Sequence, residues 1–263
     1  MALPDELIRE AFHAVVALAQ RATVPFIVEK GDLAESFGTG TLIEANGRHF
    51  IVTAEHVARH INQFEPGIPC GGQKREIWFP GNGLVTKIAK HDVAVLRLDD
   101  DATVVRLKAC WEFLTLDSVR LDMATTRTAL FLHGYPTSLS PKVGAAIRAI
   151  PMSLVTSRYN GLLDDFPLGE PYDQNVDLLL DHQVKGVDDM GRLTDLPDLK
   201  GISGCSVWAV ELPENESRQR IWQPRENAKI VAVQTGYKKG CWLRSKRWWV
   251  IKRIFDELAT TFV

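Results

Sequence analysis

The sequence predicts a mostly β protein of the sandwich or barrel class, with a short helix near each end. From residue 24 onward, short runs of β-branched and other apolar residues alternate with clusters of Gly, Pro, Asn and Asp. Many short strands separated by turn residues are typical of antiparallel sandwiches and barrels. Apolar residues at helical spacing stand before the first of these runs and after the last.

Each element follows from its local pattern. A helix is predicted after Pro4, because apolar residues recur there at spacings of three and four. These residues are Leu7, Ala11, Val15 and Leu18. The predicted strands are 24–28, 40–44, 49–54, 76–79, 92–98, 129–133, 230–234 and 248–251. Asn46-Gly47 between two of these runs indicates a hairpin, and residues 253–258 are predicted to be helical.

The composition excludes several classes of protein. The chain has 263 residues, 45% of them hydrophobic, which is enough for one or two filled cores. Its net charge of −2 gives no reason to expect nucleic acid or an anionic membrane as a partner. No run approaches the ~18 apolar residues that span a bilayer. No basic region followed by an apolar stretch begins the chain, so we expect no signal peptide.

The cysteines point to a reducing compartment. Cys70, Cys110, Cys205 and Cys241 lie far apart and form no CxxC pair. In a chain of this size without a signal peptide, such cysteines are expected to be free thiols. We therefore expect a cytoplasmic protein.

Three short strings supply a histidine, an aspartate and a serine in that order. His56 follows one predicted strand, Asp92 opens another, and Ser203 stands between glycines in Gly201-Ile202-Ser203-Gly204. A serine hydroxyl becomes a good nucleophile when an imidazole takes its proton, and a carboxylate holds that imidazole in the right tautomer. The three residues therefore predict a catalytic triad of Ser203, His56 and Asp92.

The strings resemble the motifs of the chymotrypsin/trypsin-like serine proteases, and more closely those of their bacterial stand-alone members. The matching segments are Gly38-Thr39-Gly40, Thr53-Ala54-Glu55-His56-Val57, Asp92-Val93-Ala94-Val95-Leu96 and Gly201-Ile202-Ser203-Gly204. The resemblance implies two antiparallel β-barrels with the active site between them. It also implies a protein or peptide substrate and a reaction that needs no metal or cofactor.

The resemblance also implies a division of the chain and a set of binding residues. Residues 1–22 form a helical extension, 23–118 the first barrel with His56 and Asp92, and 119–263 the second barrel with Ser203 and a terminal helix. The N–H groups of Gly201 and Ser203 are expected to form the oxyanion hole. The substrate pocket is expected at Pro197, Asp198, Gln234, Thr235 and Gly236.

The sequence departs from the family pattern at several positions. Digestive members carry, directly before the serine, an aspartate that pairs with a newly cut N-terminus, and here that residue is Ile202. Activation by that ion pair is therefore not expected. Val57 stands where secreted members carry a cysteine, and Cys205-Ser206 replaces the usual pair after Gly204. Because an unrestrained protease would harm the cytoplasm, we expect a narrow substrate range or a regulatory protein partner.

Alternatives remain at this stage. A catalytically silent fold that binds peptides or proteins is the competing function. His56 and His60 have the spacing of a zinc motif, but Glu55 precedes the first histidine instead of following it. Cys205 is interpreted as a small core residue in preference to a nucleophile.

Two charged segments have two interpretations each. The acidic segment 164–198 is a solvated loop or an approach that favours basic substrates. Residues 238–253 combine basic residues with Trp242, Trp248 and Trp249. This pattern suits single-stranded nucleic acid, but we favour a last strand and helix with tryptophans packed inward and the charges in water.

Overall fold

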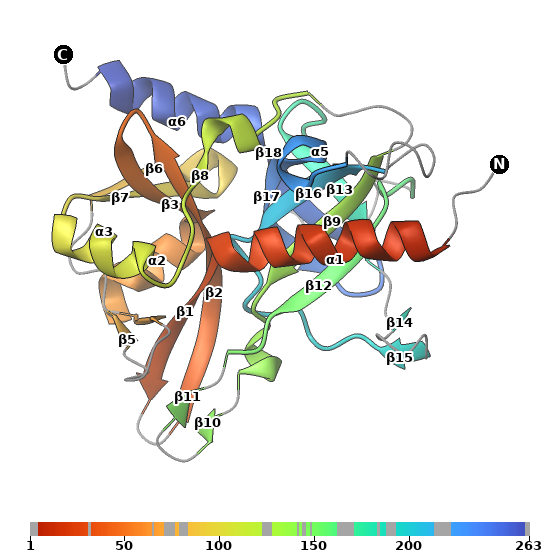
Figure 1. Ribbon diagram of the computed structural model, residues 1–263, viewed down its shortest axis with the longest axis horizontal. Coiled ribbons are helices and arrows are strands. Elements are labelled where there is room, and N and C mark those ends of the chain that lie inside the picture. The colour runs from red at the N-terminus through yellow and green to blue at the C-terminus, as the bar shows by residue number, and fades with distance from the viewer. Residues whose placement is uncertain are drawn as a thin grey trace.

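The computed structural model describes 13 ranges of the chain, and its helices and strands form two lobes joined by a shared core (Figure 1). The described residues are 5–30, 33–64, 66–70, 77–78, 84–122, 128–140, 142–143, 146–147, 149–161, 171–182, 185–187, 193–212 and 222–260. In this part of the chain, no helix has both the length and the apolar character needed to cross a membrane.

The first sheet holds the histidine and the aspartate. Its strand order is β1-β2-β3-β7-β6, and β8 pairs with β2 in parallel. The strands are β1 (Thr23–Lys30), β2 (Leu33–Ala45), β3 (Arg48–Ala54), β6 (Leu84–Ile88), β7 (Val93–Leu98) and β8 (Leu114–Thr115). A two-stranded ribbon of β4 (Ile68–Pro69) and β5 (Ile77–Trp78) lies beside β1 through an Ile27–Gly67 bridge. Helices α2 (Glu55–Phe64) and α3 (Asp101–Lys108) and the turns η1 (Ala89–His91) and η2 (Leu116–Ser118) connect these strands.

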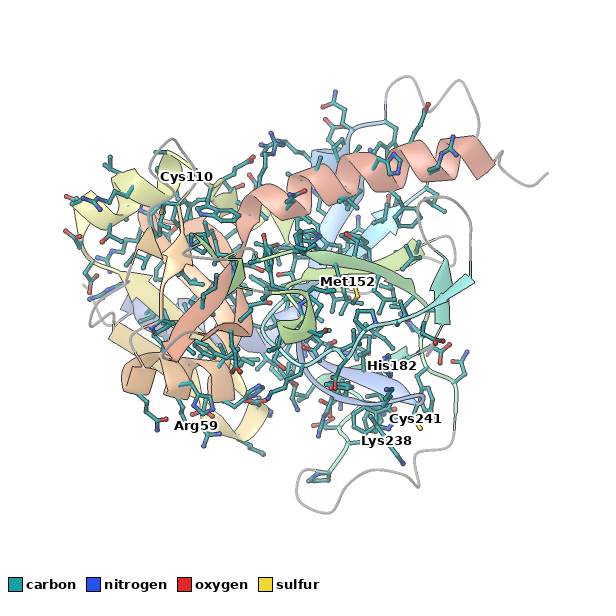
Figure 2. All side chains as sticks on the ribbon, turned by 90° about the horizontal axis from the view of Figure 1, so that it is seen from below. Arg59, Cys110, Met152, His182, Lys238 and Cys241 are labelled. Carbon is teal, nitrogen blue, oxygen red and sulfur yellow. The ribbon has the colours of Figure 1, made fainter. Side chains whose placement is uncertain are left out.

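The second sheet has the order β12-β9-β16-β17-β18-β13 and is antiparallel throughout. Its strands are β9 (Thr128–Gly134), β12 (Met152–Thr156), β13 (Asp177–Asp181), β16 (Ser206–Glu211), β17 (Ala228–Lys238) and β18 (Trp242–Arg247). A bridge between Arg158 and Leu180 joins β13 to the chain that follows β12, so the sheet curls back on itself. At the tip of the β17–β18 hairpin, His182 lies beside Lys238 and Cys241 (Figure 2).

Smaller elements complete the second lobe. They are η3 (Thr137–Leu139), the ribbon of β10 (Lys142–Val143) and β11 (Ala146–Ile147), the ribbon of β14 (Lys185–Val187) and β15 (Leu193–Asp195), and α5 (Pro224–Asn227). The termini are helical, with α1 (Asp5–Ala22) and α6 (Trp248–Thr260). The predicted all-β fold with terminal helices is confirmed, and so is the hairpin at Asn46-Gly47, whose φ angles are 52° and 73°.

The prediction of a strand at 248–251 is wrong, because α6 begins at Trp248. Four residues are too few to separate a strand from the first turn of a buried helix. The buried residues of the segment continue at helical spacing through Ile251, Phe255 and Leu258. This spacing places one apolar face of α6 on the core. The division at residue 118 stays a prediction.

One hydrophobic core joins both sheets to both terminal helices. Leu18 of α1 and Ile254 of α6 are fully buried in the same cluster as Val52 of the first sheet and Trp208 of the second. Phe50 and Phe255 meet edge to face, with 5.0 Å between ring centroids. The predicted amphipathic helix therefore packs on the body of the protein. The side chain of Leu7 lies outside the described residues.

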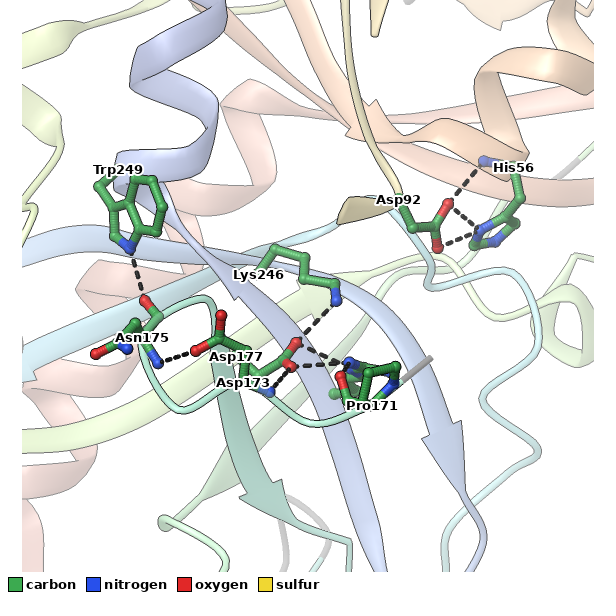
Figure 3. A network of polar contacts seen from close by, with 9 residues as sticks. His56, Asp92, Pro171, Asp173, Asn175, Asp177, Lys246 and Trp249 are labelled. Atoms are coloured by element: carbon green, nitrogen blue, oxygen red, sulfur yellow. Dashed lines mark hydrogen bonds and ion pairs between the residues drawn. The ribbon is translucent and has the colours of Figure 1, made fainter. Parts of the chain in front are cut away.

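A buried ion-pair cluster contradicts the expectation that the charges of 238–253 lie in water. Arg244 donates two hydrogen bonds to Asp177, at 2.9 and 2.8 Å. Lys246 Nζ lies 2.8 Å from Asp177 Oδ1 (Figure 3). All three residues are buried. Burial alone would raise the pKa of Asp177, but the bonds from Arg244 and Lys246 hold it below its usual value. Trp242 and Trp248 pack inward as predicted, whereas Trp249 is partly exposed.

Because His133 is buried, we expect the folded protein to lose stability in mild acid. Its Nδ1 lies 3.0 Å from Ser153 Oγ, and Nε2 has no partner among the described residues. Burial lowers the pKa of His133 to about 4. The unfolded chain, with a histidine pKa near 6.5, therefore binds more protons than the folded one below that pH. The free energy of unfolding should fall by about 2 kcal/mol between pH 7 and pH 5 through this group.

The comparison that isolates His133 is between the natural chain and His133→Asn. Urea unfolding at pH 7 and pH 5 measures the change for each. Burial also lowers the pKa of His182, which adds a loss of the same sign to both proteins. The natural chain and His133→Asn should differ in how much the free energy of unfolding changes between pH 7 and pH 5, and this difference is due to His133. Exposed His13→Asn is the matched control. An equal pH dependence in both proteins would refute the assignment.

Candidate active site

His56 and Asp92 are joined at the end of the first sheet. β3 ends at Ala54, β7 begins at Val93, and these two residues pair across the strands. This pairing brings the adjoining residues together (Figure 3). His56 Nδ1 lies 2.8 Å from Asp92 Oδ2 and 3.1 Å from Oδ1, and the backbone N–H of His56 donates to Oδ1 at 3.0 Å. The carboxylate therefore holds both the ring and the backbone of His56.

Asp92 has a left-handed backbone, with φ of 49°. Only glycine adopts this region freely, and Asn and Asp tolerate it better than other residues. The turn lets the carbonyl of Asp92 accept a hydrogen bond from Glu55 N at 3.2 Å while its side chain reaches His56. The His56 side chain is 36% exposed and that of Asp92 24%. The pair is thus accessible at the surface.

The loop that carries Ser203 is shaped by two glycines. Gly201 and Gly204 have φ of 98° and 93°. A Cβ on Gly204 would lie 2.0 Å from Thr39 O and 3.0 Å from Ala54 N. The loop therefore lies against β2 and against the end of β3, two residues before His56. Ser203 itself is partly exposed.

The two N–H groups expected to form the oxyanion hole differ from the neighbouring N–H groups of the loop in their hydrogen bonding. Ile202, Gly204 and Cys205 donate to Leu199 O, Gln234 O and Ile202 O, at 2.8 to 3.1 Å. No acceptor within the described residues receives the N–H of Gly201 or of Ser203. Gly201 is buried, and Ser203 is partly exposed.

Ile202 and Cys205 are core residues. Both are buried, and they belong to the cluster that fills the second sheet together with Leu199. Burial strongly raises the pKa of the Cys205 thiol. A thiol held neutral and out of solvent is a poor nucleophile, which supports the interpretation of Cys205 as a packing residue. All four cysteines have reduced side chains outside any disulfide.

The residues expected to form the substrate pocket lie on two adjacent segments. Asp198 accepts hydrogen bonds from the Tyr237 hydroxyl and from Lys200 N, and the bond from Tyr237 chiefly lowers the pKa of Asp198. Burial, together with this bond, raises the pKa of Tyr237 to about 12. Gln234 and Thr235 are buried, whereas Pro197 and Gly236 are partly exposed. Gln234 Nε2 donates to Gly236 O at 3.0 Å.

The geometry bears on the zinc alternative and on one residue of the acidic segment. His56 Nδ1 is occupied by Asp92, and the His60 ring lies edge-on to Phe37. The described residues contain no group of three or more His, Cys, Asp or Glu arranged to hold a metal. In the acidic segment 164–198, Asp177 is a buried ion-pair partner. It therefore lies neither in a solvated loop nor on an approach for basic substrates. Asp164, Asp165, Glu170, Asp188 and Asp189 lie outside the described residues.

The sequence reasoning missed three threonines that surround the Ser203 loop. Thr39 donates its N–H to Ser203 O at 2.8 Å and its hydroxyl to Gly201 O at 2.9 Å. Thr53 donates to Thr39 O at 2.7 Å, and Thr137 N donates to Lys200 O at 2.7 Å. The only signal in the sequence was a polar residue between two glycines in Gly38-Thr39-Gly40.

Comparisons with known proteins give matches to solved structures only. No family model matches the chain, and no curated protein matches it. One similar structure comes from a study of coupled folding and binding of the intrinsically disordered Sesbania mosaic virus VPg protein. It has a TM-score of 0.46 and 15% identity, covering 88% of this chain and 87% of the other. Another is a serine-to-alanine mutant of Rv3671c from M. tuberculosis H37Rv in an inactive form. It has a TM-score of 0.49 and 12% identity, covering 100% of this chain and 98% of the other.

Proposed function

We propose that this chain is a serine endopeptidase with Ser203 as nucleophile, His56 as general base and Asp92 as the orienting carboxylate. The observation that carries the proposal is the Asp92–His56 contact of 2.8 Å, on the strand end against which the Ser203 loop packs. With Nδ1–H bound to the carboxylate, the lone pair of the neutral ring is on Nε2, where it can accept a proton.

The proposed reaction proceeds through an ester on Ser203. Ser203 Oγ attacks the scissile carbonyl carbon while its proton passes to His56 Nε2, and the N–H groups of Gly201 and Ser203 stabilise the oxyanion. The carbon–nitrogen bond then breaks, and His56 returns the proton to the leaving amine. Water next attacks the ester and gives a proton to His56. That proton returns to Ser203 Oγ as the acid product leaves.

Reaction with a fluorophosphonate probe tests the proposal, because such probes form a bond with activated serines. The full-length protein should become labelled, and mass spectrometry should place the label on Ser203. Ser203→Ala should remain unlabelled, whereas Ser157→Ala, at an exposed serine, should react like the natural chain. A natural chain that stays unlabelled would favour the peptide-binding module and refute the enzyme.

The proposal extends to the class of substrate and to the cellular compartment of the protein. We propose a protein or peptide substrate, and a profile of cleaved peptides from a diverse library would define its sequence. Four cysteines outside any disulfide suit a reducing cytoplasm. A regulatory protein partner is proposed as the restraint on the enzyme.

A further inference from the structure

We infer that Thr39 and Thr137 hold the Ser203 loop in its catalytic shape, in place of the N-terminal ion pair for which Ile202 leaves no partner. The inference rests on the proposed function and assigns positioning roles to two residues outside the triad. Four consecutive carbonyl groups of the loop accept the hydrogen bonds that matter here, those of Lys200, Gly201, Ile202 and Ser203.

Each of the four carbonyls has a protein donor. Lys200 O accepts from Thr137 N at 2.7 Å, and Ile202 O accepts from Cys205 N at 3.0 Å. Thr39 holds the other two, with its hydroxyl on Gly201 O at 2.9 Å and its N–H on Ser203 O at 2.8 Å. None of these peptide planes can rotate without breaking a hydrogen bond.

Two of these anchors, on Lys200 O and Ile202 O, set the direction of the two oxyanion donors. Thr39 holds the Gly201–Ile202 peptide between them and the Ser203–Gly204 peptide that follows. In a trans peptide, the C=O and the N–H point in opposite directions. Because Lys200 O is held by Thr137, the N–H of Gly201 in the same peptide points away from Thr137. Because Ile202 O is held by Cys205, the N–H of Ser203 points away from Cys205. Those are the two N–H groups that lack an acceptor within the described residues.

Thr39 also links this loop to the strand that leads to His56. It is fully buried, its carbonyl accepts from Thr53 Oγ1 at 2.7 Å, and its hydroxyl accepts from Tyr135 N at 3.1 Å. Thr53 lies on β3, three residues before His56. One buried side chain thus connects the end of the first sheet, the segment after β9 and the nucleophile loop.

Thr137 is anchored at the same place. Its hydroxyl donates to Ser36 O at 2.5 Å, and its backbone lies so close to Gly201 that a Cβ there would meet Thr137 N at 2.8 Å. At this distance only glycine fits at position 201 of the loop. The loop is therefore fixed from β2 on one side and from η3 on the other.

Acylation by p-nitrophenyl acetate tests the inference without knowledge of the peptide substrate. Thr39→Val removes the hydroxyl with little change in shape, and Thr39→Ser restores it. Loss of an oxyanion-hole donor costs roughly 10²- to 10³-fold in rate. We expect Thr39→Val to lower the acylation rate constant at least tenfold with the dissociation constant of the ester unchanged within about twofold, because the oxyanion forms only in the transition state. Thr39→Ser should stay within about threefold of the natural chain.

A second pair of variants tests the backbone anchor. Thr137→Pro removes the N–H that holds Lys200 O, and Pro136 before it has ψ of 138°, which a following proline accepts. Thr137→Ser keeps both the N–H and the hydroxyl and is the matched control. Proline should lower the acylation rate constant about 10²-fold, and serine should change it by no more than about threefold. Circular dichroism identifies any variant that fails to fold. If Thr39→Val fails to fold, the two Thr137 variants test the inference in its place.

The outcomes separate the inference from the proposed function. A natural chain with no acylation refutes the enzyme and, with it, the role of the two threonines. An active natural chain whose valine and proline variants match their controls refutes the inference and leaves the enzyme. A rise in the dissociation constant with an unchanged acylation rate also refutes the inference, because it would show an effect on binding alone.

Discussion

Asp92→Asn should lower kcat about 10⁴-fold while leaving the fold in place. Asparagine tolerates the positive φ of this position, and its side-chain oxygen can still accept from His56 N. Its NH₂ group, however, would face His56 Nδ1, where Asp92 Oδ2 now lies at 2.8 Å. The imidazole must then accept at Nδ1 and carry its proton on Nε2, so it can no longer take the proton of Ser203.

The measurement combines ester acylation with chemical unfolding. The free energy of unfolding of Asp92→Asn should stay close to that of the natural chain. Asp122→Asn, which removes the same charge from an exposed position, should keep full activity. An Asp92→Asn protein that retains more than a tenth of the natural kcat would show that His56 does not depend on this carboxylate.

Removal of α1 should destabilise the whole protein and should not activate it. Val15, Leu18, Ala19 and Ala22 are buried in the core that joins the two sheets, and Phe12 packs 6.4 Å from Phe131. Leu18→Ala alone should lower the free energy of unfolding by about 2–5 kcal/mol. Because native domains are stable by only about 5–15 kcal/mol, a chain that begins at Thr23 should be largely unfolded or aggregated at 37 °C.

Exposed Gln20→Ala on the same helix is the control, and it should change the unfolding free energy by less than about 0.5 kcal/mol. Activity per folded molecule should be equal in Leu18→Ala and the natural chain. A truncated chain with a tenfold gain in kcat, about 1.4 kcal/mol of barrier, would instead identify α1 as an inhibitory propeptide.

Local patterns in the sequence predicted the elements whose partners lie close in the chain. The spacing of Ala11, Val15 and Leu18 predicted α1, and Asn46-Gly47 predicted the β2–β3 hairpin. The error at 248–251 has a local cause as well, since the first turn of α6 is as apolar as a strand and only the residues beyond it reveal the period. The roles of Ser203 and of the pocket residues stay predictions.

Contacts between distant residues could not be predicted. Arg244 and Asp177 are 67 positions apart, and their buried pairing depends on the register of β13 against β18. Gly201 and Thr39 are 162 positions apart, so the polar residue in Gly38-Thr39-Gly40 could not show which carbonyl groups of the Ser203 loop it would hold. Burial of such polar groups becomes acceptable only when the fold supplies the partner.

The core that joins the two sheets also bears on the order in which the growing chain can fold during its synthesis. Val250, Ile251 and Ile254 of α6 pack in the same cluster as Val52, which lies four residues before His56. Val52 and Ile254 lie about three quarters of the chain apart in sequence, and long-range contacts form late in folding. The ribosome must therefore make α6 before β3, the strand that leads to His56, has its complete core. We therefore expect the proposed protease site to be incomplete while the chain is still being made.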